Sequence, residues 1–244
     1  MVMNWLYPLS ISALVLGFAT AGVIIIDEVR HSQHMWIMNV VWPVTALFGT
    51  VLVLWVYFHY GRLATMEAAM KAKNRDAELQ NRIGTPFAVS VVKATLHCGS
   101  GCTLGDICAE WLAFAFPSIA IWLGWHWLFN EKIFAVWVID YIFAFTLGIA
   151  FQYYTIVPMR HLKMAEGVRA ALKADALSLT AWQIGMYGFM AFASFYVFPH
   201  LFALRLKVDS VEFWFMLQIA MLCGFLTSYP VNWWLLRSGI KETM

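Results

Sequence analysis

Apolar residues fill six long stretches of the chain, and short polar connections separate these stretches. A helix needs roughly 20 mostly apolar residues to cross the hydrocarbon core of a bilayer, and each stretch is about that long. The pattern therefore predicts an all-α integral membrane protein, in which residues 1–244 form one domain, a bundle of about six transmembrane helices. The predicted spans are Leu6–Ile26, Met35–Phe58, Ile107–Leu128, Ile133–Val157, Ala176–Phe198 and Val211–Leu235.

The composition is typical of a membrane protein and limits the classes of partner that we expect. Hydrophobic residues make up 62% of the chain and charged residues 12%, against about 25% charged residues in soluble domains. The net charge of +2 gives no reason to expect nucleic acid as a partner. The expected partners are the lipid bilayer, a metal ion, and a partner protein or a second copy of the chain.

The basic residues predict how the spans are oriented. The connections at 61–85 and 159–175, together with the residues after the last span, carry eleven lysines and arginines, whereas the connections on the other side carry four. Cytoplasmic loops of membrane proteins carry the excess of Lys and Arg. Six spans with both termini in the cytoplasm fit this count.

The segment "ATLHCGSGCTLGDICAEW" holds three of the four cysteines, a histidine and two carboxylates next to the third predicted span. On a helix, Cys98, Cys102, Asp106 and Glu110 follow one another every four residues and lie almost above each other. Cys98 and Cys102 are then close enough to share an ion. His97 projects from the neighbouring side and needs a bend in the helix to join them.

Glycines in the same segment predict that bend. The sequence "GSG" at 99–101 is a poor helix interior, and broken membrane helices expose backbone groups that line ion or substrate sites. The sequence "TLGD" has the form of a capping box, so a new helix can begin at Thr103, with Asp106 capping its backbone N–H groups instead of touching a ligand. The third helix is therefore expected to be broken or kinked near the motif.

The ligand chemistry indicates a soft metal. Thiolate and imidazole together suit Cu(I) or zinc, and thioether ligands, available from 13 methionines, favour Cu(I). The predicted metal ligands are His97, Cys98, Cys102 and Asp106. Two alternatives stay open: thiol redox chemistry between the two cysteines, and a purely structural helix break. On a regular helix the two Cα atoms lie about 6 Å apart, which a disulfide can bridge, but the Cβ directions are unfavourable.

Other ionisable residues inside or beside the spans are further candidates, because such groups are costly in a membrane. Glu110 and Asp140 are expected to form a proton or ion path, or else to be neutral packing groups. Lys93 either pairs with a carboxylate or extends to the interface. His31 and His34, in "DEVRHSQH", are predicted on the outer face, where they either capture a cation or form an ordinary polar loop.

Three segments, "HCGSGCTLGD", "LSLTAWQIGMYGFM" and "TSYPVNWWLLRSGIKE", resemble a bacterial multi-pass membrane family catalogued only as a domain of unknown function. The resemblance runs from about Lys93 to the C-terminus and includes a motif of the form HCG[SA]GCTLGD. It implies a location in the bacterial cytoplasmic membrane and brings no established activity. Some relatives occur beside heavy-metal handling modules, which favours copper slightly.

The function predicted from these observations is binding or translocation of a soft metal ion, Cu(I) above others, at the cytoplasmic end of the third span. No catalytic residue is assigned, and binding or transport is favoured over catalysis. No G-x-x-x-x-G-K-[ST] motif is present, so transport would draw on a gradient or a partner. The alternatives are a membrane thiol or metal redox enzyme subunit that uses Cys98 and Cys102, and a non-catalytic membrane subunit of a larger complex.

Overall fold

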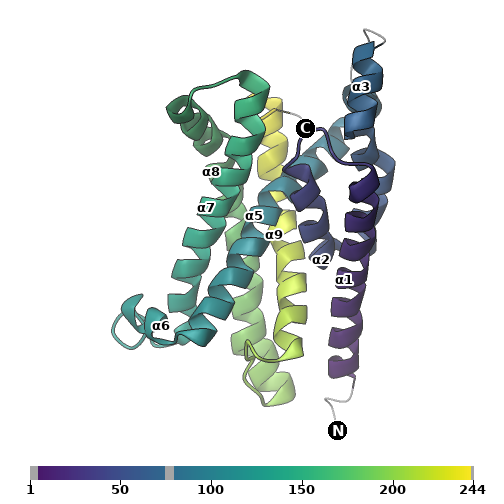
Figure 1. The fold of residues 1–244 in the computed structure, drawn as a ribbon. Coiled ribbons are helices and arrows are strands. Elements are labelled where there is room, and N and C mark those ends of the chain that lie inside the picture. Colours follow the sequence, from purple (N-terminus) through teal and green to yellow (C-terminus); the bar gives the residue numbers. More distant parts are fainter. Residues whose placement is uncertain (1–4, 75–79, 243–244) are drawn as a thin grey trace.

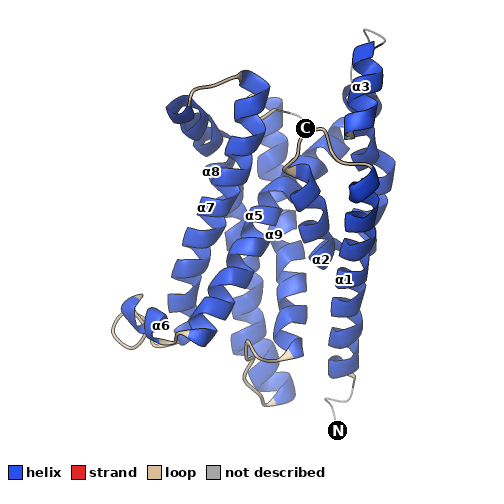
Figure 2. Ribbon diagram, viewed as in Figure 1, coloured by secondary structure: helices blue, strands red, loops and turns tan. Residues whose placement is uncertain are grey.

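The computed structural model describes residues 5–74 and 80–242, and within them it consists of helices packed side by side in an elongated bundle (Figures 1 and 2). The predicted all-α membrane bundle is confirmed. The helices are α1 (Leu6–Arg30), α2 (Met38–Val56), η1 (Tyr57–Gly61), η2 (Arg62–Ala64), α3 (Met66–Asn74), α4 (Gln80–Gly84), α5 (Phe87–Ala115), α6 (Ser118–Trp122), α7 (Lys132–Arg160), α8 (Met164–Phe192), η3 (Ala193–Phe202) and α9 (Val211–Arg237).

Five helical segments in the described part of the chain are long and apolar enough to cross a membrane, as in a multi-pass membrane protein. They are α1, α2 with η1 and η2, α7, α8 with η3, and α9. α5 is not among them, although its 29 residues give a length of about 43 Å. Its polar side chains are buried inside the bundle rather than exposed to lipid.

The second apolar stretch folds back on itself instead of crossing. The backbone reverses at Thr50, which has φ 44° and ψ −122°. As a result, Gln33 before α2 and Thr65 after η2 form an antiparallel bridge, and the Trp42 and Tyr57 rings lie 5.6 Å apart. A straight helix of this length would separate its two ends by about 40 Å. The stretch therefore enters the bundle and leaves it at the same end.

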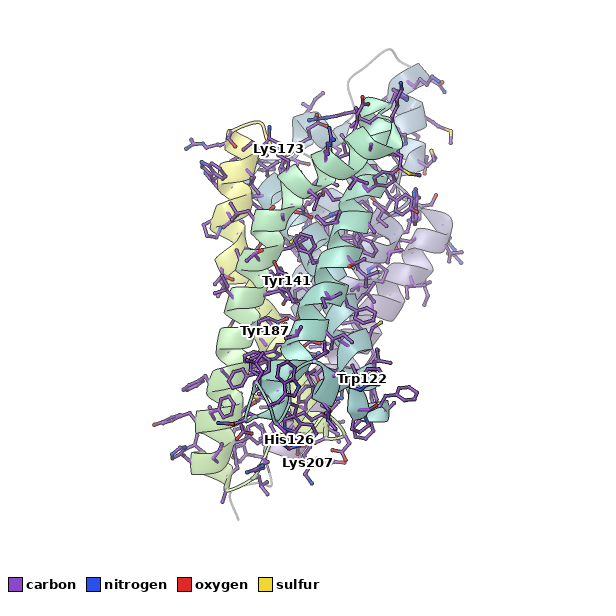
Figure 3. The ribbon with its side chains drawn as sticks, turned by 90° about the vertical axis from the view of Figure 1, so that its left-hand side faces the viewer. Trp122, His126, Tyr141, Lys173, Tyr187 and Lys207 are labelled. Atoms are coloured by element: carbon purple, nitrogen blue, oxygen red, sulfur yellow. The ribbon has the colours of Figure 1, made fainter. Side chains whose placement is uncertain are left out.

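This hairpin changes the predicted topology. Figure 1 shows the start of α1 and the end of α9 at opposite ends of the bundle. The expectation that both termini lie on one side is therefore wrong, because only α1, α5, α7, α8 and α9 run from end to end. We call the end that carries α3, α4, the start of α8 and the end of α9 the basic end. Figure 3 shows Lys173 there, and Lys207 at the opposite end together with Trp122 and His126.

The reversal at Thr50 strains its backbone, because positive φ is unfavourable for a β-branched residue. Thr50→Gly is expected to raise stability by about 1 kcal/mol, or a few degrees in the unfolding temperature of the detergent-purified protein. Thr50→Ala, which keeps a Cβ atom, is the control and should give no such gain. A Thr50→Gly variant no more stable than Thr50→Ala would contradict the strained turn.

The third crossing helix differs from its prediction in position and in continuity. The predicted span Ile107–Leu128 is replaced by α5, which ends at Ala115, so the cysteine motif lies in the middle of the helix and not at its mouth. No residue inside α5 leaves the helical conformation. The predicted break is therefore wrong, and Thr103 does not begin a helix; its hydroxyl donates to Gly99 O within α5, at 2.8 Å.

The glycines of the motif have a packing role. A Cβ atom on Gly101 would lie 2.6 Å from the Cα atom of Gly148, and one on Gly105 would lie 2.5 Å from the Cα atom of Ala144. Gly101 and Gly105 thus form a small-x-x-x-small pattern on α5 that meets a matching pattern on α7. Such pairs let the backbones of membrane helices approach closely.

Candidate functional site

Polar and ionisable side chains form a continuous buried line along α5, between α7, α8 and α9. We call this line the polar seam. From the basic end it contains Lys241, Asp175, Ser178, Cys98, Cys102, Gln183, Asp106, Asp140 and Glu110, all of them buried.

The seam begins with an ion pair between Lys241 Nζ and Asp175 Oδ1, 2.6 Å apart, both side chains fully shielded from solvent. Lys241 Nζ also donates to Asn232 Oδ1 at 2.8 Å and to Ala94 O at 3.4 Å. Ser178 Oγ donates to the same Asp175 oxygen at 2.6 Å. The second carboxylate oxygen, Asp175 Oδ2, has no hydrogen-bond partner.

The thiol pair follows. Cys98 Sγ lies 3.4 Å from Ser178 Oγ. Because the Ser178 hydroxyl proton goes to Asp175, the Cys98 thiol is the donor in this contact. Cys102 follows one helical turn later, on the same face of α5. Both residues are fully buried free cysteines. The structure therefore brings these two predicted ligands together on one face of an unbroken helix. In contrast, Cys108 is exposed and Cys223 is partly exposed.

His97 lies on a different side of α5 and contacts α7. Its Nε2 atom is 3.0 Å from Thr155 Oγ1. Thr155 donates its hydroxyl proton to Phe151 O, at 3.1 Å, so His97 Nε2 acts as the donor in its bond to Thr155. The lone pair of His97 Nδ1 is then free, and this buried atom has no partner.

Three carboxylates continue the seam toward the opposite end. Gln183 Nε2 donates to Asp106 Oδ1 at 3.3 Å. Glu110 lies one helical turn after Asp106 on α5, and Asp140 lies on α7, which packs closely against α5 where Gly105 faces Ala144. Lys132 Nζ donates to Ala113 O of α5 at 3.2 Å, near Glu110. Asp106 Oδ2 and Asp140 Oδ1 have no hydrogen-bond partner. The group can hold protons or compensate a cation, because each carboxylate is shielded from water.

A cavity of about 610 Å³ opens at the basic end and reaches Thr155, the partner of His97. It lies between the residues that precede α2, the α4 helix and the end of α7. An ion pair between Arg160 and Glu242, with Nε 2.8 Å from Oε1, lies in its wall. The polar residues that line it include His34, Asn81, Tyr154, Thr155, Arg160 and Glu242.

Two groups of predicted residues lie apart from the seam. His31 and His34 share the basic end with Arg62, because Asp27 contacts both His31 and Arg62 there. The predicted topology placed these histidines at the end opposite the 61–85 connection, whereas the hairpin formed by α2 brings them to the same end as η2. Lys93 Nζ donates to Asn81 Oδ1 of α4, so its side chain extends toward the basic end and pairs with no carboxylate among the described residues.

The predicted metal ligands are only partly assembled. In residues 5–74 and 80–242, no three His, Cys, Asp or Glu side chains are arranged to hold one metal ion. Cys98 and Cys102 meet, His97 bonds to α7, and Asp106 bonds to α8. Because α5 is unbroken, it holds His97 about 100° away from Cys98 around the helix axis.

Sequence reasoning missed Asp175, Ser178 and Lys241 as site residues. The hydropathy pattern predicts a polar connection whose last residue is Asp175. In the structure α8 begins at Met164, so Asp175 lies well inside a helix. One signal was present: Asp175, Ser178 and Trp182 recur at the three- and four-residue spacing of a single buried helix face. Lys241 carried no such signal.

Comparison with known protein families matches a Domain of unknown function (DUF4396) to residues 89–241. No curated protein and no solved structure matches the chain. The matched range contains every residue of the polar seam, whereas α1 and the α2 hairpin precede it. Because the match covers more than half of the chain, the chain belongs to this DUF4396 family, as the resemblance of its three segments indicates.

Proposed function

We propose that this protein binds Cu(I) between Cys98 and Cys102 and moves it along the polar seam. The observation that carries the proposal is the fully buried thiol pair, one helical turn apart on the same face of α5, in the middle of a line of ionisable groups that runs along the bundle. Buried ionisable residues in membrane proteins commonly mark ion and proton pathways.

Cu(I) suits the pair better than zinc does. Thiolates select soft ions, and Cu(I) is satisfied by two of them, whereas a structural zinc site takes four protein ligands. The described residues offer no such group of four. Thiol redox chemistry is less favoured, because two cysteines four residues apart on an unbroken helix direct their Cβ atoms poorly for a disulfide.

The remaining groups have separate roles in this proposal. The cavity at the basic end admits the ion, and His97 connects the cavity to the helix that carries the thiols. Asp106, Glu110 and Asp140 exchange protons or compensate charge beyond the thiols. The basic end faces the cytoplasm of a bacterial inner membrane, since cytoplasmic segments carry the excess of Lys and Arg. The start of α1 then faces the other side.

Copper binding by the thiol pair is testable with matched double variants. The reduced, detergent-purified protein should retain about one Cu(I) per chain against a competing chelator, and Cys98→Ser/Cys102→Ser should retain none. Cys108→Ser/Cys223→Ser also removes two cysteines but should bind like the unaltered protein. Copper content is measured by elemental analysis.

Three results would overturn this assignment. They are no copper in the unaltered protein, equal copper in both double variants, and a Cys98–Cys102 disulfide that forms readily under mild oxidation. His97→Ala should leave the copper content unchanged, because His97 is bonded to α7 and not to the thiol pair.

Transport is tested separately from binding. Asp140→Asn preserves the shape of the side chain but removes its charge, so copper content should stay the same while the rate of Cu(I) uptake into proteoliposomes falls by about tenfold or more. The control is Glu131→Gln, since Glu131 is exposed next to α7. Equal uptake by both variants would exclude Asp140 from the pathway.

A further inference from the structure

The Lys241 ammonium occupies a cage of oxygen atoms at the basic end of the polar seam. The chain turns back after α9, with Gly239 at φ 69° and the Lys241 backbone N–H donating to Leu235 O at 3.1 Å. This turn directs Lys241 into the bundle, where its side chain is fully shielded from solvent. Lysine is almost never fully buried without a partner.

The cage matches the ammonium group in number of ligands and in charge. An ammonium group donates three hydrogen bonds, and the cage provides three acceptors: Asp175 Oδ1 at 2.6 Å, Asn232 Oδ1 at 2.8 Å and Ala94 O at 3.4 Å. A fourth oxygen, Asp175 Oδ2, is buried and has no partner. The carboxylate supplies one negative charge.

Contacts other than those with Lys241 hold the cage in place. Asn232 Nδ2 donates to Ser228 O at 3.1 Å and to Ser228 Oγ at 3.0 Å, which turns the amide oxygen toward the cage. Ser228 Oγ donates to Ser178 O at 3.0 Å, and Ser178 Oγ donates to Asp175. We therefore expect the oxygens to keep their arrangement when the lysine is removed.

We propose that Asp175, Asn232 and the Ala94 carbonyl form a binding site for a monovalent cation of ammonium size, such as K⁺, and that Lys241 is its tethered occupant. All three oxygen distances exceed the roughly 2.1 Å of Mg²⁺ sites, and two of them, 2.8 and 3.4 Å, exceed the roughly 2.3–2.6 Å of Ca²⁺ sites. Backbone and side-chain carbonyl oxygens are the ligands with which proteins replace the hydration shell of K⁺. A cation can enter only when Lys241 withdraws.

The test uses Lys241→Ala, purified in KCl and then exchanged into choline chloride, whose cation is too large for the cage. The variant should unfold at a lower temperature in choline than the unaltered protein. Its unfolding temperature should rise saturably with K⁺ or NH₄⁺, on the order of 5 °C at saturation. The unaltered protein should respond little, because its own ammonium fills the site. Intrinsic tryptophan fluorescence reports the transition.

Two variants serve as controls. Lys173→Ala removes an exposed lysine from the same helix as Asp175 and should behave like the unaltered protein (Figure 3). Lys241→Ala/Asp175→Asn lacks the carboxylate and should show no saturable response to K⁺.

The proposal fails if Lys241→Ala has the same unfolding temperature in choline and K⁺, if the double variant responds equally, or if Lys241→Ala does not fold even in KCl. The site does not involve the thiols, so it is independent of copper binding by Cys98 and Cys102. Copper binding can fail while the K⁺ response is observed, and the reverse also holds.

Discussion

Gly105→Leu is expected to cause the largest loss of folded protein among single substitutions in α5. A Cβ atom at this position would lie 2.5 Å from the Cα atom of Ala144, and the obstacle is backbone, which no rotamer change can move. α5 and α7 would have to separate, and the contact that places Asp106 and Asp140 near one another would be lost. Overpacking a well-packed core costs about 1–3 kcal/mol, and occasionally more. We expect a leucine forced between two backbones to cost about 3 kcal/mol or more.

The matched control for Gly105→Leu is Gly188→Leu. Gly188 also lies inside a long helix, α8, and a Cβ atom there has no neighbour within 4 Å. Leucine favours the helix over glycine by about 0.8 kcal/mol, so the control should be as stable as the unaltered protein or slightly more so. Size-exclusion profiles and unfolding temperatures of the two purified variants decide the matter. Equal stability would mean that α5 and α7 do not approach as closely as described.

The role of these glycines shows where sequence reasoning fails. Glycine is both a poor helix former and the residue that allows two membrane helices to pack closely. The sequence "GSGCTLG" fits either role, and the deciding partners, Ala144 and Gly148, lie about 40 residues further along the chain. The all-helical, membrane character of the chain was predictable, because apolar length is a local property.

The α2 hairpin could not be predicted for a related reason. Its 27 residues, Met38–Ala64, are as long and as apolar as a true span. What distinguishes it is one backbone reversal at Thr50, a residue whose type does not signal a turn. That single reversal placed the start of α1 and the end of α9 at opposite ends and moved His31 and His34 to the basic end.

The candidate site was predictable only along one helix. The four-residue spacing of Cys98, Cys102, Asp106 and Glu110 placed them on one face, and the structure has all four buried there. The partners contributed by other helices were not predictable. Asp175 and Lys241 are 66 positions apart, and only the packing of α8 against α9 and the turn after α9 bring them together.

The Asp175–Lys241 pair should show strong energetic coupling in a double-mutant cycle. Removing one partner leaves the other charged and buried, and such losses amount to about 3–5 kcal/mol. Asp175→Leu and Lys241→Met should therefore each destabilise the protein by that amount. The combined variant contains neither charge, so it should be much more stable than the sum of the two losses predicts. The free energies of unfolding are measured in mixed detergent with choline as the only cation, because K⁺ is expected to stabilise Lys241→Met.

An exposed ion pair supplies the control at the same distance. Lys71 Nζ and Glu67 Oε1 are also 2.6 Å apart, but their side chains are 67% and 60% exposed. The hydrogen bond from Lys71 lowers the pKa of Glu67, yet solvent screens such pairs, so Lys71→Met should change stability by no measurable amount. If Lys241→Met destabilised the protein as little as Lys71→Met does, burial would not strengthen the Asp175–Lys241 contact. If only the buried pair is strongly coupled, the Lys241 ammonium fills the basic end of the polar seam, and only another cation can take its place.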